Sequence, residues 1–258
     1  MIYGRGIADQ RTKIITRIAM TRIDKLLSSM GYGSRADIAR LARAGAITLD
    51  GARLTDSARR IPVTPDLPSR LMIDGEALDP LAGMVILMNK PLGVTCSHKD
   101  SGPLVYGMLP DRWRLRQPVL STVGRLDRQT SGLLLLTDDG DLLHRIISPR
   151  RHVRKTYRVT LARPLDGSES AIFAAGDLML RGETTPLAPA ELTVVSDTEV
   201  LLGITEGRYH QVRRMFAAIG NHVESLNREQ LGGLSLPADL APGQWTLLGA
   251  SEIASIFE

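Results

Sequence analysis

Residues 124–132 read Gly-Arg-Leu-Asp-Arg-Gln-Thr-Ser-Gly, so that one carboxylate, Asp127, stands between two arginines with a glycine at each end. The glycines permit a tight loop. Flanking cations keep an aspartate ionised, as a nucleophile requires, and they also attract phosphate. The same pattern fits a surface ion pair, and spacing alone does not decide between the two interpretations.

The loop is one of four motifs that together resemble those of the RNA pseudouridine synthases. Residues 124–133 are similar to the catalytic motif of that family, and residues 88–93, Met-Asn-Lys-Pro-Leu-Gly, to the motif on its opening strand. Residues 155–157 resemble its tyrosine motif and residues 206–216 its third motif, and all four occur in family order. The resemblance implies an enzyme that isomerises uridine to pseudouridine in RNA.

The resemblance also implies roles for single residues. Asp127 matches the catalytic aspartate, Tyr157 the tyrosine that packs on the target base, and Arg213 the basic residue that pairs with that aspartate. By their propensities alone, Tyr157 and Leu226 fit ordinary core residues at least as well. Arg125 is expected to fill the space of the extruded base, Leu226 to line the pocket and Arg214 to contact phosphate. The full set of expected substrate-binding residues is Arg125, Leu126, Arg128, Thr130, Asn89, Lys90, Arg208, Arg214 and Leu226.

Pseudouridine differs from uridine only in being joined to ribose through C5 instead of N1. The reaction therefore needs cleavage of the glycosidic bond, rotation of the base and rejoining, with no redox step, so we expect no cofactor and no metal. The site must supply an ionised carboxylate and a shielded pocket that retains the detached uracil. Whether Asp127 attacks the ribose or the base stays open.

The N-terminal part, residues 20–81, is similar to the S4 RNA-binding domain at residues 22–27 and 34–35. Helical spacing of apolar residues predicts two short helices, and the Asp50-Gly51 pair predicts a hairpin turn after them. Residues 1–60 carry a net charge of +7 and the remainder −3, which favours contact with a phosphate backbone, although a solvated surface explains the charge equally well. The residues expected to contact RNA in this module are Arg22, Lys25, Ser34, Arg35, Arg40 and Arg43.

The remaining chain, residues 82–258, predicts a mixed, mainly antiparallel β-sheet with flanking helices, so the fold class is α+β with a small S4-like α/β module in front. Residues 1–19 are expected to be a disordered leader, or to lie upstream of a true start at Met20. The elements predicted most clearly are strands at residues 84–88, 133–137, 156–161 and 200–205 and a helix at residues 209–219.

The sequence argues against several classes of protein. The chain has no dinucleotide, P-loop or metalloprotease signature, and no apolar run long enough for a membrane helix. The single cysteine, Cys96, fits a reducing compartment, so we expect a cytoplasmic protein. The five histidines are expected to be surface or satisfied residues, and the acidic run at residues 138–141 a turn followed by a helix N-terminus. A monomer is expected.

Within the S4-bearing synthases, residues 217–243 resemble the RsuA family, whose members act on small-subunit ribosomal RNA. This likeness implies uridine 516 of 16S ribosomal RNA as the target, with a partly assembled ribonucleoprotein particle as a candidate substrate. Two alternatives remain: a synthase that acts on large-subunit 23S RNA, since such enzymes share the catalytic motifs, and a non-catalytic S4 protein of ribosome assembly.

Overall fold

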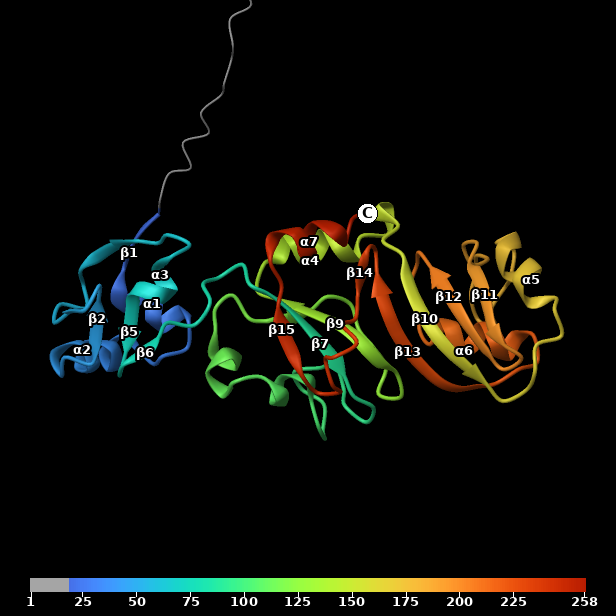
Figure 1. Cartoon of the computed structure of the whole chain (residues 1–258), viewed down its shortest axis with the longest axis horizontal. Helices are drawn as coiled ribbons and strands as arrows, with labels where there is room; N and C mark the ends of the chain where they lie inside the picture. The colour runs from blue at the N-terminus through green and yellow to red at the C-terminus, as the bar shows by residue number, and fades with distance from the viewer. Residues whose placement is uncertain (1–18) are drawn as a thin grey trace, which may run out of the picture. The chain divides into compact units, whose positions relative to one another are not determined.

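The computed structural model describes residues 19–258, which divide into two compact units (Figure 1). The first comprises residues 19–28 and 32–79, and the second residues 29–31 and 80–258. The boundary expected from the sequence lies after residue 81. The expected leader lies outside the described residues except for Ala19.

The first unit packs short helices on two small sheets. Its core is formed by side chains such as Ile23, Ile38 and Leu71, which are fully buried. The predicted turn is present, with φ of 51° at Asp50 and 77° at Gly51, as a two-residue hairpin requires. The elements are β1 (Met20–Arg22), α1 (Ile23–Ser29), α2 (Arg35–Arg43), β2 (Ile47–Leu49), β3 (Ala52–Arg53), β4 (Arg60–Pro62), α3 (Leu67–Arg70), β5 (Leu71–Ile73) and β6 (Glu76–Ala77).

The second unit, which we call the catalytic unit, is built on a nine-stranded sheet. The path through the sheet is β11-β12-β10-β13-β9-β7-β15, with β14 added to β13 and β8 to β9. The strands are β7 (Val85–Lys90), β8 (Ser121–Thr122), β9 (Ser131–Thr137), β10 (Lys155–Leu161), β11 (Glu191–Ser196), β12 (Glu199–Ile204), β13 (Val223–Leu231), β14 (Leu234–Ser235) and β15 (Trp245–Leu247).

One parallel pairing joins two antiparallel halves of this sheet, with β7, β9 and β15 on one side and β10–β13 on the other (Figure 1). The seam between the halves consists of two residue pairs, Asn227 with Ser131 and Arg228 with Gly132. At Gly132, φ is +102°, and an added Cβ would stand 2.3 Å from the Arg228 carbonyl oxygen. Only glycine therefore lets β9 and β13 approach this closely.

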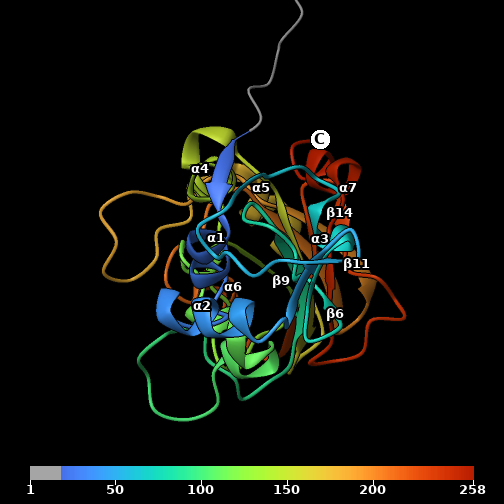
Figure 2. The same cartoon turned by 90° about the vertical axis from the view of Figure 1, so that its left-hand side faces the viewer.

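Both faces of the β7–β9 half are covered, which explains why these strands are continuously apolar and do not alternate. Leu134 and Leu136 of β9 point into the larger core, which also contains Phe173 and Phe216. The intervening leucines point to the opposite face and its smaller core. The helices are α4 (Gly140–Ile147) and α7 (Ala250–Ser255) over the smaller core, both seen toward the top of Figure 2, and α5 (Glu169–Ala175) and α6 (Gln211–Ala218) over the larger one.

The strongly patterned elements were predicted correctly, with ends that differ by no more than two residues. The acidic run does begin a helix, because Asp139 accepts hydrogen bonds from the backbone N–H groups of Asp141 and Leu142 at the start of α4. Short 3₁₀ turns at Val105–Met108, Asp111–Leu115 and Pro149–Arg151 complete the unit. None of the helices within residues 19–258 is long and apolar enough to cross a membrane.

Candidate active site

A cleft of about 590 Å³ opens in the catalytic unit where the two halves of the sheet meet. Its walls come from the loop before β9, from β10, β12 and β13, and from the segment that enters α6. Eight of the twelve residues expected to be catalytic or to bind substrate line it, while the other four lie elsewhere. The eight are Arg125, Leu126, Asp127, Thr130, Tyr157, Arg208, Arg213 and Leu226.

The loop that carries Asp127 is held through its backbone. All four carbonyl groups of residues 127–130 accept hydrogen bonds: from Lys90 Nζ at Asp127 (3.1 Å) and Thr130 (2.8 Å), from Gly93 N at Arg128 (2.8 Å) and from Arg213 Nη2 at Gln129 (2.8 Å). The Asp127 side chain itself stays 38% exposed toward the cleft. The carboxylate therefore has a fixed position and is still accessible, which is the geometry that preorganised catalysis needs.

Lys90 does not lie where substrate could reach it. Its side chain is fully buried, and its ammonium group donates to three backbone carbonyls, the third being that of Pro91 at 3.0 Å. Burial lowers the pKa of this amine, and the charge of Asp127 partly opposes the shift. Neighbouring Asn89 is buried as well and donates to the carbonyl of Leu240 at 2.8 Å. The expectation that these two residues bind substrate was wrong, because their polar groups are occupied inside the fold.

Arg213 supports the loop in a different way from the one expected. Its Nη1 donates to the carbonyl of Val223 and its Nη2 to that of Gln129, both at 2.8 Å. Within residues 19–258 it forms no ion pair with Asp127. Since both terminal nitrogens are already bonded to carbonyls, Arg213 connects α6, β13 and the loop and does not neutralise the carboxylate.

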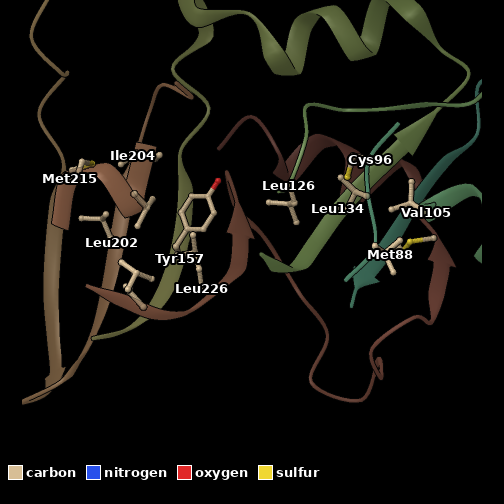
Figure 3. Packing of buried hydrophobic residues seen from close by; sticks show 14 of the residues in the cluster. Met88, Cys96, Val105, Leu126, Leu134, Tyr157, Leu202, Ile204, Met215 and Leu226 are labelled. Carbon is tan, nitrogen blue, oxygen red and sulfur yellow. The ribbon is translucent and has the colours of Figure 1, made fainter. Parts of the chain in front are cut away.

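Apolar side chains form one wall of the cleft. Tyr157 on β10 is 8% exposed and lies between Ile204 on one side and Leu126 on the other, with Leu226 beneath it (Figure 3). The tyrosine hydroxyl points away from Leu226. An aromatic face beside two leucines offers a flat base a stacking surface.

The other arginines of the motifs mainly hold loops together. Glu183 accepts hydrogen bonds from Arg214 Nη1 at 2.8 Å and from Arg208 Nη1 at 3.4 Å. Arg128 is exposed, and its Nε donates to the carbonyl of Gly93 at 3.2 Å. Arg214 and Arg128 do not line the cleft, so neither is placed beside a base bound there.

Among the cleft residues that the sequence interpretation missed, three have basic side chains: His210, Lys155 and Arg228. His210, expected to be a surface or satisfied residue, places Nε2 3.5 Å from Asp127 Oδ1 and stacks on Tyr209 with ring centroids 3.9 Å apart. Lys155 and Arg228 line the floor of the cleft. Alternation along a strand could have revealed these two, because each lies two residues from a predicted pocket residue and so on the same face.

The basic residues expected to contact RNA in the first unit are exposed on its surface. Ser34 caps α2, accepting a hydrogen bond from Asp37 N at 3.2 Å. Arg22 forms a two-pronged ion pair with Asp24, and Arg40 pairs with Asp37. Arg35, Arg40 and Arg43 lie within about 140° of the circumference of α2, at 100° per residue. They therefore form one basic face.

Within residues 19–258, no group of three or more histidine, cysteine or acidic side chains could hold a metal ion.

One cleft of a mixed sheet is thus lined by a fixed, accessible aspartate, a tyrosine and a leucine. The chain belongs to the RNA pseudouridylate synthase family, a class of RNA-modifying enzymes. The model of that family matches residues 84–218, and the S4 domain model matches residues 21–64. The chain is thus an RNA pseudouridine synthase with an N-terminal S4 domain, and the predicted α+β fold class is confirmed.

Among its relatives, the chain is 44% identical to ribosomal small subunit pseudouridine synthase A of Yersinia pestis, over 91% of this chain and 97% of that protein. It is 43% identical to the protein of the same name from Escherichia coli strain K12, over 91% and 99%. A crystal structure of a pseudouridylate synthase, 37% identical in sequence, superposes with a TM-score of 0.64 over 91% of this chain and 99% of that one.

Proposed function

We propose that the chain converts one uridine of small-subunit 16S ribosomal RNA, at position 516, to pseudouridine. The relatives named above carry the small subunit in their names and match the chain over nearly their whole length. The substrate is naked RNA or a partly assembled ribonucleoprotein particle, and the enzyme works as a monomer in the cytoplasm. No cofactor takes part.

The observation that carries the proposal is the immobilised backbone of residues 127–130 beneath an exposed carboxylate. Holding a carboxylate partly out of water in a cleft costs free energy of desolvation, and fixing the loop around it costs conformational entropy as well. An idle site has no need of either. Asp127 is therefore assigned as the nucleophile, which attacks the ribose or the base.

Tyr157 is assigned as the residue that stacks on the target uracil and assists removal of the C5 proton. Its ring forms one wall of the cleft, with Leu226 and Leu126 adjoining it (Figure 3). These side chains exclude water from the base while the glycosidic bond is open. Loss of uracil to solvent is prevented in this way.

A uridine in structured RNA must leave its stack before it can enter the cleft, at a cost of a few kcal/mol. Arg125 is exposed at the rim and is assigned to fill the vacated space. The S4 domain contributes phosphate contacts that offset this cost. Binding and catalysis are thereby divided between the two units.

The proposed reaction is tested by mapping its product. Purified protein is incubated with naked 16S RNA, with 16S RNA carrying small-subunit proteins, and with 23S RNA, and carbodiimide-resistant adducts are located by primer extension. We expect one new adduct, at position 516 of 16S RNA. A protein with Asp127→Asn serves as the control.

Each other outcome has a defined meaning. A product only in 23S RNA would move the target to the large subunit. Binding to 16S RNA without any adduct on naked or protein-bound substrate would refute catalysis and favour the role in ribosome assembly.

Neutralising the basic face of α2 tests the S4 assignment. Arg35→Gln, Arg40→Gln and Arg43→Gln together should weaken RNA binding and lower the slope of log K against log salt by about 1–3 units, since each phosphate contact contributes about 0.7–0.9. Filter binding at several salt concentrations measures this slope. The matched control replaces the same three residues with lysine, which keeps the charge and should keep the slope. An unchanged slope in the glutamine variant would show that this face does not meet phosphate.

A further inference from the structure

The floor of the cleft contains a guanidinium group with unused hydrogen-bonding capacity. Arg228 on β13 is 3% exposed, and its Nε donates to the carbonyl of Leu133 at 2.8 Å. Its Nη2 is buried without a hydrogen-bond partner. Buried guanidinium groups normally have all their donors satisfied, so an unpaired Nη2 on a residue that lines the cleft points to a partner that arrives with the substrate.

Strand register places this group next to the expected position of the base. Arg228 lies directly opposite Tyr157 in the β10–β13 pair, and side chains of opposed residues project from the same face. Leu226 and Lys155, each two residues away along its own strand, share that face and also line the cleft. A uracil stacked on the tyrosine therefore has both cations at its edge.

Neither cation is neutralised by the protein. Within residues 19–258, no carboxylate forms an ion pair with Arg228 or Lys155. The nearby Glu206 is engaged with Ala188 N at 3.0 Å and Gln211 Nε2 at 2.9 Å. Burial, and next the charge of Arg228, lower the pKa of Lys155 to about 8, with Glu206 opposing the shift. The floor thus carries positive charge that no ion pair within residues 19–258 neutralises, which favours an anionic ligand.

We propose that Arg228, supported by Lys155, binds the carbonyl oxygens of the target uracil and stabilises the negative charge that this base carries while it is detached from ribose. The inference rests on the proposed function and adds a catalytic residue to it. When the N1–C1′ bond breaks, its electron pair stays with the uracil and is shared by N1, O2 and O4. In the route in which Asp127 attacks the ribose, its carboxylate takes the place of N1 on C1′. Ring atom C5 then supplies an electron pair to form the C5–C1′ bond, while the Asp127–C1′ ester bond breaks and returns its pair to the carboxylate. The C5 proton leaves by way of Tyr157, and N1 takes up a proton from water. Atoms and electrons balance without a redox partner.

Arg228→Met tests this role, because methionine keeps much of the side-chain volume and removes the charge. We expect single-turnover conversion to fall about 10²–10³-fold, as when one preorganised donor is lost, while RNA affinity stays within about twofold. Arg228→Lys should restore part of the rate, and Lys155→Met should cause a smaller loss. Arg163→Met, at an exposed arginine of the same unit, is the control.

A second readout separates charge stabilisation from a structural role. With 5-fluorouridine at the target position the detached base is less basic and needs less stabilisation, so the defect of Arg228→Met in cleaving the glycosidic bond should shrink at least about tenfold. A defect of equal size on both substrates, or a rate within about threefold of wild type on uridine, would overturn the inference. A loss of RNA affinity at unchanged rate would assign the cations to a phosphate.

The wild-type protein and the Lys155 variant distinguish a failure of this inference from a failure of the proposed function. Absence of conversion by the wild-type protein would contradict the proposed function itself. If Arg228→Met alters the tryptophan fluorescence of the folded protein, Lys155→Met tests the inference by the same comparison of uridine and 5-fluorouridine.

Discussion

Replacing Asp127 with asparagine is expected to lower single-turnover formation of pseudouridine by at least about 10⁴-fold, the scale seen when a residue that acts directly in the chemistry is removed. Asparagine keeps the shape of the side chain but offers no anionic oxygen for attack. The backbone of residues 127–130 should keep its hydrogen bonds, because these come from Lys90, Gly93 and Arg213 and do not involve the carboxylate. Rates are measured on the RNA identified by product mapping.

RNA affinity distinguishes a chemical role of Asp127 from a role in binding. We expect the dissociation constant of the Asp127→Asn variant to change by less than about twofold. Asp100→Asn, which removes an exposed carboxylate outside the cleft, is the matched control and should keep full activity. Conversion by Asp127→Asn at more than a tenth of the wild-type rate would remove Asp127 from the role of nucleophile.

Gly132→Ala is expected to destabilise the catalytic unit by about 2–6 kcal/mol. Strain at a positive φ contributes about 1–3 kcal/mol and overpacking about 1–3 kcal/mol. The added Cβ would meet the Arg228 carbonyl oxygen at 2.3 Å and the Arg228 N at 2.8 Å. These are backbone atoms of a central strand, so the clash cannot be relieved by rotating a side chain. The two halves of the sheet must move apart instead.

Urea unfolding followed by tryptophan fluorescence measures this effect selectively. Both tryptophans, Trp113 and Trp245, lie in the catalytic unit, so the signal reports on that unit. Gly140→Ala is the control, since this glycine has no atom within 4 Å of an added Cβ and does not need a positive φ. Equal unfolding midpoints for the two variants would mean that the close approach of β9 and β13 is not required.

Local sequence patterns predicted the fold well wherever the type and spacing of neighbouring residues favour one structure. The Asp50-Gly51 turn and the continuous leucines of β9 each follow from the conformational or burial preference of a few neighbouring residues. The parallel pairing of β9 with β13 could not be predicted in this way. It joins segments about ninety residues apart and depends on the single close approach at Gly132.

In the site, too, the sequence indicated which residues belong there but not which groups they contact. The motifs identified Asp127, Tyr157 and Leu226 as neighbours, and all three line the cleft. They misassigned Lys90, because a lysine in a motif near the site suggests a substrate contact, whereas its amine is buried against three carbonyls. The sequence shows that a side chain can donate a hydrogen bond, but it does not show which acceptor, distant in the chain, that side chain reaches in the fold.

The seam of two residue pairs also affects how the sheet bends under load. β10 and β13 share seven residue pairs, and β7 and β9 share six, so each half of the sheet is joined by more backbone pairs than the line between the halves. The Asp127 loop enters β9 in one half, and Tyr157 belongs to β10 in the other. A load from bound RNA would bend the sheet along the seam before it deformed either half. The distance between the nucleophile and the tyrosine would then follow how the RNA flexes that line, and Arg213 would limit the change, because it bonds the Asp127 loop to the start of β13.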